Sequence, residues 1–308
     1  MMTTYITSLM ENMPEETRTG GCQDVDLLVE GGAFNGAYLI GTYYFLKEME
    51  RRRYVRVRRI SSCSVGAFCS MVYLLDRLDL FEDIYVQFID IFRKTGTLHI
   101  YDELFDRLHK TLDVDAYQKV SGMLYVTYHN VKTRKQVVRS TYTSNADMFN
   151  VIKRSAFIPF VVDKTLGLDN KYMDGINPYF FRKPHPNCRT LYLNLVNLSK
   201  LDIITQTLTI RNEENSLRRI LVGVLDAHSF FSTHVPTSMC CYMDDMPLGV
   251  SVQLHVKHIL MVISVFLLSM LMYISSYISD AMRSTVLYKV CIAVFNETYQ
   301  VVIRHYCC

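Results

Sequence analysis

Three short segments of this chain hold residues whose types and spacing suit acyl-transfer chemistry. They are residues 30–36 (EGGAFNG), residues 62–66 (SCSVG) and the dipeptide Asp174-Gly175. A serine hydroxyl becomes a nucleophile when a base lies within hydrogen-bond reach, and a carboxylate can be that base. The N–H groups of a glycine-rich loop can stabilise the charge that develops on the attacked carbonyl oxygen. Ser64 as nucleophile and Asp174 as base are therefore the predicted catalytic residues.

The segment around Ser64 nearly matches the G-x-S-x-G nucleophile elbow. In such an elbow the serine lies on a strained turn between a strand and a helix, and small flanking residues relieve crowding. Gly66 keeps the second small position, and Ser62 stands where the first glycine would be. Taken alone, the segment is equally compatible with an ordinary turn rich in serine and glycine.

The glycine-rich segment has two possible uses, an oxyanion hole or a phosphate cradle. Glycines bring backbone N–H groups close to a ligand at a helix N-terminus. The segment lacks the spacing of a dinucleotide-binding loop, and no P-loop lysine follows it. The residues predicted for an oxyanion hole are Gly31, Gly32, Ala33 and Gly36. Asp-Gly is itself a common turn dipeptide, so no single segment identifies a function.

Together and in this order, the segments resemble the motifs of the patatin-like phospholipase family. Residues 31–36 resemble its G-G-G-x-[RK]-G loop, Ser64 its nucleophile, Asp174 with Gly175 its D-G-[GA] motif, and residues 155–159 (SAFIP) its S-A-x-x-x-P stretch. The resemblance implies a serine–aspartate dyad that forms an acyl-enzyme without a metal or other cofactor. It also implies a phospholipid or neutral-lipid ester as substrate.

The chain departs from these motifs at four positions, which are Ala33, Asn35, Ser62 and Ile176. Ala33 keeps its N–H group, whereas Asn35 replaces a basic residue that could favour an anionic headgroup. These departures leave a second function open, that of a weakly active or inactive membrane-binding or scaffolding protein with the same fold.

A triad with a histidine is the competing assignment for the base. His185, His228 and His234 follow Asp174 in the chain order of α/β-hydrolases, but none of them lies in a recognisable motif.

Strand and helix signals alternate along residues 23–256, which predicts an α/β domain with a central, mostly parallel sheet flanked by helices. The resemblance implies that this is a three-layer patatin-like acyl hydrolase domain. Predicted strands cover residues 25–30, 57–62, 123–129, 135–140 and 191–196, and the third and fourth form a hairpin. Predicted helices cover residues 34–51, 65–75, 79–93, 102–110 and 145–154; most of the stretch 198–256 gives no clear signal.

Residues 259–279 run for 21 positions without a charge. About 20 apolar residues in a helix match the ~30 Å hydrocarbon core of a bilayer. We therefore predict a single-pass transmembrane helix at 257–280, with Tyr273 and Tyr277 as interfacial anchors; a buried core helix is the alternative. The remaining segments are a flexible leader at 1–22 and a C-terminal tail at 281–308, which suits a membrane surface or a partner.

The charge and the cysteine content indicate which partners and which cellular compartment to expect. A net charge of +3, scattered along the chain, gives no reason to expect a nucleic-acid partner. Nine cysteines without CxxC spacing predict neither a zinc site nor a disulfide framework, so a reducing compartment and a cytosolic catalytic domain are expected. Cys63 and Cys69 are expected to be buried thiols, and the terminal cysteine pair is either a lipidation site or a frayed end.

Overall fold

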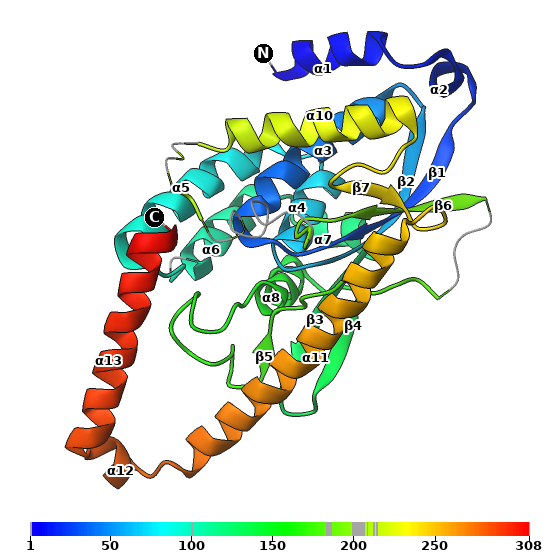
Figure 1. The fold of residues 1–308 in the computed structure, drawn as a ribbon. Coiled ribbons are helices and arrows are strands. Elements are labelled where there is room, and N and C mark those ends of the chain that lie inside the picture. The colour runs from blue at the N-terminus through cyan, green and yellow to red at the C-terminus, as the bar shows by residue number, and fades with distance from the viewer. Residues whose placement is uncertain are drawn as a thin grey trace.

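A mostly parallel β-sheet forms the centre of the protein, and helices flank it (Figure 1). The structure is a computed structural model that describes residues 2–99, 101–182, 187–198, 207, 209–211, 213 and 215–307. The strands are β1 (Gln23–Val29), β2 (Val55–Cys63), β3 (Leu124–Asn130), β4 (Lys135–Arg139), β5 (Tyr172–Met173), β6 (Cys188–Leu193) and β7 (Cys240–Tyr242). The order across the sheet is β4-β3-β2-β1-β6-β7, and β5 also pairs with β3. The prediction of a mixed α/β fold is confirmed.

The four inner strands, β3, β2, β1 and β6, run parallel, whereas β4, β5 and β7 pair antiparallel at the margins. The centre of the sheet lies at β1, whose residues from Val25 to Val29 are all buried. Four of these five residues are apolar, which suits a parallel strand covered on both faces, and the fifth, Asp26, forms an ion pair with Arg59. All five predicted strands are present with shifted ends, and the predicted hairpin is β3–β4.

Helices connect the strands and supply most of the core. They are α1 (Met2–Glu11), α2 (Glu15–Thr19), α3 (Gly36–Arg51), α4 (Val65–Leu74), α5 (Asp79–Thr95), α6 (Tyr101–Thr111), α7 (Ala116–Val120), α8 (Asn145–Ser155) and α10 (Leu217–Thr233), with a short 3₁₀ turn η1 (Ala33–Asn35) before α3. Helix α3 packs against β2 and α10, and α4 packs against β2 and β3. Helix α10 and strand β7 lie in the stretch that the sequence left unassigned.

The N-terminal segment corrects one expectation. Residues 1–22 are expected to be a flexible leader, yet α1 and α2 occupy most of them, and Ile6, Met10 and Met13 are buried in the core. The spacing of these three side chains places them on one side of the segment, against α3. The sequence of residues 1–22 lacks a signal-peptide pattern, but a segment without that pattern can still pack on the domain.

The C-terminal segment forms a pair of long helices. They are α11 (Leu248–Tyr277) and α13 (Val286–Val302), joined by the short α12 (Asp280–Ser284) and followed by η2 (Ile303–Cys307). Helix α11 begins well before the predicted boundary at residue 257. Among the described residues, α11 is the one helix long and apolar enough to cross a membrane by length and composition. Figure 1 shows that α11 and α13 diverge from their junction at α12 toward different parts of the domain.

Candidate active site

Ser64 lies on the turn between β2 and α4, in the strained backbone conformation of a nucleophile elbow. Its φ of 54° and ψ of −137° place a non-glycine residue in a sparsely populated region. The Ser64 N–H donates to Ser155 Oγ at 2.9 Å, and that hydroxyl donates to the Thr127 carbonyl at 2.6 Å. Ser155 therefore fixes the elbow to β3. The sequence identified residues 155–159 as a motif, but it gave Ser155 no role.

Gly66 and Ser62 occupy the two elbow positions that favour small residues, and they differ in how well the surrounding structure accommodates them. A Cβ at Gly66 would lie 2.5 Å from the Glu30 carbonyl oxygen, so α4 can approach β1 this closely only with glycine there. Ser62 is accommodated inside β2 with no exposed surface. Its hydroxyl is buried without a hydrogen-bond partner among the described residues, which is a cost that glycine would not carry.

Asp174 lies directly after β5 and is brought to Ser64 by the sheet. Its carboxylate is buried beside the Ser64 side chain, which lowers the pKa of Asp174. The Ile176 N–H donates to Asp174 Oδ1 at 2.7 Å. Burial raises the pKa of Asp174 to about 6, against the lowering effects of the Ser64 side chain and the Ile176 N–H group. At neutral pH most of this carboxyl is still ionised and can accept a proton.

The turn that carries Asp174 is held on both sides. The Asp174 N–H donates to the Phe157 carbonyl at 2.9 Å, and the Gly175 N–H donates to the Ser155 carbonyl at 3.1 Å. A Cβ at Gly175 would lie 2.2 Å from the Thr127 carbonyl oxygen, so glycine is required there. Ile176, the departure from the family motif, has a φ of 58°, which is strained for a β-branched residue.

One histidine contacts this turn, but not in the way a triad requires. His129 on β3 donates from Nδ1 to the backbone carbonyl of Asp174 at 3.0 Å, and burial lowers the pKa of His129. No sequence signal distinguished it. His228 packs on Phe45 beside α3, His234 ends α10 in a left-handed conformation, and His185 lies outside the described residues.

The glycine-rich loop packs against the elbow. A Cβ at Gly31 would lie 2.6 Å from Ser64 Cβ, and a Cβ at Gly36 would lie 2.5 Å from Val65 Cγ2. At Gly32 a Cβ would meet Leu195 Cβ at 2.8 Å. Ala33, the departure from the third glycine, adopts a φ of 43° and lines the same cavity as Ser64. The structure thus brings together all the residues predicted for the dyad, the elbow and the oxyanion loop.

Asn35, at the position where the resembled motif has a basic residue, points into the protein. It is fully buried, and its Nδ2 donates to the Leu195 carbonyl at 2.8 Å. Its Oδ1 accepts from Arg219 Nη1 at 2.8 Å, and Arg219 also pairs with Glu213. Asn35 therefore ties the loop to the end of β6 and to α10.

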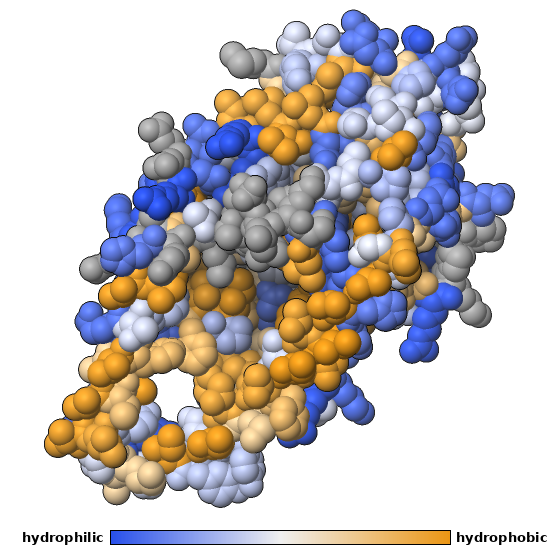
Figure 2. Space-filling model, viewed as in Figure 1, coloured by the Kyte–Doolittle hydropathy of each residue, from blue (hydrophilic) through white to orange (hydrophobic). Residues whose placement is uncertain are grey.

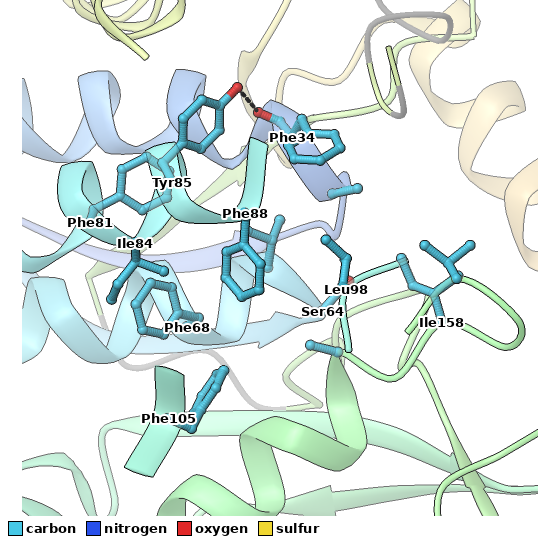
Figure 3. A pocket seen from close by; sticks show the side chains of 14 residues that line it. Phe34, Ser64, Phe68, Phe81, Ile84, Tyr85, Phe88, Leu98, Phe105 and Ile158 are labelled. Atoms are coloured by element: carbon cyan, nitrogen blue, oxygen red, sulfur yellow. Dashed lines mark hydrogen bonds between the residues drawn. The ribbon is translucent and has the colours of Figure 1, made fainter. Parts of the chain in front are cut away.

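An apolar cavity of about 80 Å³ opens beside Ser64 (Figure 3). Its walls come from the loop, from α4 to α6 and from the segment after α8, and they are almost entirely aromatic and aliphatic. The side chains that form them include Phe34, Phe68, Phe81, Ile84, Tyr85, Phe88, Leu98, Phe105, Ile158 and Val161. The volume is about half of the ~150 Å³ at which an apolar cavity holds benzene. In this conformation the cavity has room for part of an acyl chain.

A buried ion pair lies at the start of the glycine-rich loop. Lys257 Nζ contacts the two carboxylate oxygens of Glu30 at 2.7 and 2.8 Å and donates to Asn194 Oδ1 at 3.0 Å. Tyr192 donates to the same carboxylate. Glu30 directly precedes Gly31, and Lys257 belongs to α11, so this pair joins the long apolar helix to the glycine-rich loop. Sequence reasoning treated Lys257 only as the border of a membrane span.

The described residues contain no group of His, Cys, Asp or Glu side chains arranged to hold a metal ion. Cys63 and Cys69 are free, buried thiols, as predicted, and burial raises the pKa of both. No known protein-family model matches the chain, and no curated protein sequence is significantly similar to it. The assignment of an activity therefore depends on the geometry of this site and on the motif resemblance.

Proposed function

We propose that this protein is a membrane-associated lipid acyl hydrolase of the patatin-like type, with Ser64 as nucleophile and Asp174 as base. One observation carries the proposal. A serine on a strained strand-to-helix turn lies beside a buried carboxylate whose pKa it lowers, next to an apolar cavity and a glycine-rich loop. Each part alone occurs in many proteins, but together they provide a nucleophile, a base, an oxyanion site and an acyl pocket.

The proposed reaction has two steps. Asp174 takes the proton of Ser64 as the hydroxyl oxygen attacks the acyl carbonyl carbon, and backbone N–H groups near Gly32 and Ala33 stabilise the oxyanion. The intermediate collapses, the acyl–oxygen bond of the substrate breaks, and the leaving alcohol takes the proton from Asp174. Asp174 then takes a proton from water as the water oxygen attacks the acyl-serine; the bond between the acyl carbon and Ser64 Oγ breaks, Ser64 takes the proton back from Asp174, and the fatty acid leaves.

The substrate and the setting follow from the surroundings of the site. The apolar walls suit an acyl chain of a phospholipid or neutral lipid, and the apolar α11 suits a membrane. The free, buried thiols suit a reducing compartment, and we therefore propose that the catalytic domain lies at the cytosolic face of a membrane.

The test is release of free fatty acid from vesicles that contain phospholipid and triacylglycerol. Ser64→Ala and Asp174→Asn should each abolish release while the circular dichroism spectrum stays unchanged. The matched controls are Ser8→Ala on α1 and Asp169→Asn, both at exposed positions, and both should keep full activity. Equal activity of the parent and Ser64→Ala would refute the proposal.

A fluorophosphonate that labels serine nucleophiles distinguishes the proposed hydrolase from the second candidate function. The strained Ile176 and the unsatisfied Ser62 hydroxyl favour this candidate, a binding or scaffolding protein with little turnover. An aligned dyad should be labelled at Ser64, and labelling should fall strongly in Asp174→Asn. A folded parent protein that is neither labelled nor active would support the binding function.

A further inference from the structure

The helices α11 and α13 carry a large apolar surface that the protein itself does not cover. The side chains of Ile259, Phe266 and Tyr277 on α11 are 58%, 46% and 67% exposed, and those of Val286 and Val294 on α13 are 78% and 60% exposed. Figure 2 shows apolar residues along both helices on one face of the molecule. Soluble monomers rarely expose contiguous apolar patches of this extent, so this surface requires a covering phase or partner.

One stripe of α11 is packed against the domain along much of its length. Met261, Val265 and Leu268 are buried against Val131 and Met173, at the helical spacing of one face. Farther along, a Cβ at Gly167 would lie 2.5 Å from Met272 Cε. The stretch from Lys257 to Met272, about 16 residues or roughly 24 Å of helix, therefore lies along the protein surface. A helix held in this way cannot be surrounded by lipid.

A charge lies at the middle of the apolar stretch. Arg134, in the turn between β3 and β4, donates from Nε to Ser269 Oγ at 3.1 Å, and its Cζ lies 5.1 Å from the centre of the Phe266 ring. Ser269 is the midpoint of residues 259–279. If this stretch crossed a bilayer in the observed conformation, Arg134 would lie at the bilayer centre, where a charged side chain costs about 3 kcal/mol or more.

Helix α13 returns to the domain. Its Tyr299 hydroxyl donates to the Gly96 carbonyl at 2.8 Å, and the Ile210 N–H donates to the Cys307 carbonyl at 2.8 Å. The other end of the helix pair is held by Lys257 and Glu30. Both ends of the segment therefore contact the same domain. A single pass would place the C-terminal tail on the opposite side of the membrane and break the contacts of α13.

We infer that α11 and α13 lie in the plane of a membrane, embedded in one leaflet, and do not cross it. An interfacial helix buries an apolar face ~5–10 Å deep and tolerates polar residues along its edge, such as Lys289 and Glu297 on α13. Lys132, Arg134 and Lys135, all exposed in the turn beside α11, suit the headgroups of anionic lipids. The lipid bilayer is thus the occupant that fits both the apolar helices and the cationic turn.

This arrangement would present the mouth of the cavity to the leaflet. The segment after α8 contributes Ile158 and Val161 to the cavity, and its Phe160 contacts Phe295 of α13 at a ring distance of 5.5 Å. The same segment contacts α11 at Gly167. It is therefore held between the two helices. This inference deepens the membrane part of the proposed function, but it does not depend on Ser64 being a nucleophile.

The chain contains no tryptophan, so single-tryptophan variants report depth without background. The variants Ile259→Trp, Met270→Trp, Tyr277→Trp and Val294→Trp are prepared in a Ser64→Ala chain, which leaves the lipids intact. Their fluorescence is measured on phosphatidylcholine–phosphatidylserine vesicles with bromine at different depths of the acyl chain. Tyr5→Trp on α1, at the far side of the domain, is the control and should not be quenched (Figure 1).

The inference predicts that all four tryptophans are quenched best by shallow bromine, at similar depth. A helix that crosses the bilayer would instead place Met270→Trp deep and Ile259→Trp and Tyr277→Trp shallow, and that result would overturn the inference. Absence of quenching in all four variants would also overturn it, because the surface would then be covered by something other than lipid.

Discussion

Around Ser64 the chain satisfies most of its own polar groups, whereas along α11 and α13 it leaves apolar side chains exposed. The elbow is tied through Ser155 to β3, and the aspartate turn is tied to Phe157, Ser155 and His129. By contrast, α11 is fixed by one stripe and α13 mainly by its C-terminal end. The chain therefore positions the residues around Ser64 by its own contacts, whereas the exposed apolar surface of α11 and α13 is left for a membrane to cover in the arrangement that we infer.

The ion pair between Glu30 and Lys257 is the point where these two regions meet. Glu30 lies between β1 and the glycine-rich loop, and Lys257 lies where the packed stripe of α11 begins. Both side chains are buried, at 3% exposure for Glu30 and 9% for Lys257. Substitutions of Glu30 or Lys257 should therefore affect both the site around Ser64 and the packing of α11.

Removal of one partner of this pair should have the largest effect on stability. Lys257→Met leaves the Glu30 carboxylate buried and unpaired, which should lower the free energy of unfolding by about 3–5 kcal/mol. Urea unfolding in detergent micelles, followed by circular dichroism, measures this change. The double variant Glu30→Gln/Lys257→Met should recover most of the loss.

Lys289→Met on α13 is the control for this experiment, because Lys289 is exposed. It should change the free energy of unfolding by less than about 0.5 kcal/mol. Additive single effects at Glu30 and Lys257 would contradict a coupled pair and would separate the two regions energetically.

Gly31→Ala should nearly abolish activity without unfolding the domain. The new methyl group would lie 2.6 Å from Ser64 Cβ and 3.3 Å from Ser64 Oγ, so the loop must move away from the nucleophile. Loss of an oxyanion donor costs about 10²–10³ in kcat, and we expect a fall of this size. Gly249→Ala, where nothing lies within 4 Å of the new Cβ, should leave fatty acid release unchanged. Equal activity of the two variants would place the oxyanion site elsewhere.

The pH dependence of kcat/KM should show the ionisation of Asp174. Its pKa is raised by burial to about 6, so kcat/KM should fall about tenfold for each pH unit below this value. A carboxyl ionises with little enthalpy and an imidazolium with much more. The inflection should therefore shift little with temperature and persist in His228→Gln, and a strong temperature shift would favour a histidine base.

The same pKa has a consequence for stability, with the opposite sign from a salt-bridged aspartate. Between its ordinary pKa of ~3.9 and about 6, Asp174 binds more protons in the folded state than in the unfolded state. The contribution of Asp174 to the free energy of unfolding should therefore decrease as the pH rises through this range. Asp174→Asn should remove that part of the pH dependence.

The sequence predicted the parts of the site that depend on local turn chemistry. Glycine at residues 31, 36, 66 and 175 signals a close backbone approach, and the structure contains that approach at each position. The bond from Ser64 to Ser155, the contact of His129 with Asp174 and the Glu30–Lys257 pair join residues far apart in the chain. No local pattern encodes them, because they arise only when the sheet has formed.

The arrangement of the apolar helix α11 also depends on contacts between residues far apart in the chain. The length and composition of α11 predict a spanning helix, and they are equally compatible with a helix that packs one stripe on the domain. Only the tertiary contacts of Met261, Val265 and Leu268 distinguish the two arrangements. The tail at 281–308 was expected only to suit a membrane surface or a partner, and it contains the helix α13.

The smallest predicted effect compares two adjacent serines inside β2, both fully buried. Ser61 Oγ accepts from the Tyr179 N–H at 2.8 Å, whereas Ser62 Oγ has no partner among the described residues. Ser61→Ala should lower the free energy of unfolding by about 1 kcal/mol, because it leaves a buried N–H group unpaired. Ser62→Ala should raise it by up to about 1 kcal/mol, because it removes a hydroxyl that loses its hydration on folding. Opposite signs in urea unfolding would show that Ser62 costs stability beside the nucleophile; a loss in both variants would mean that Ser62 makes a contact that stabilises the elbow.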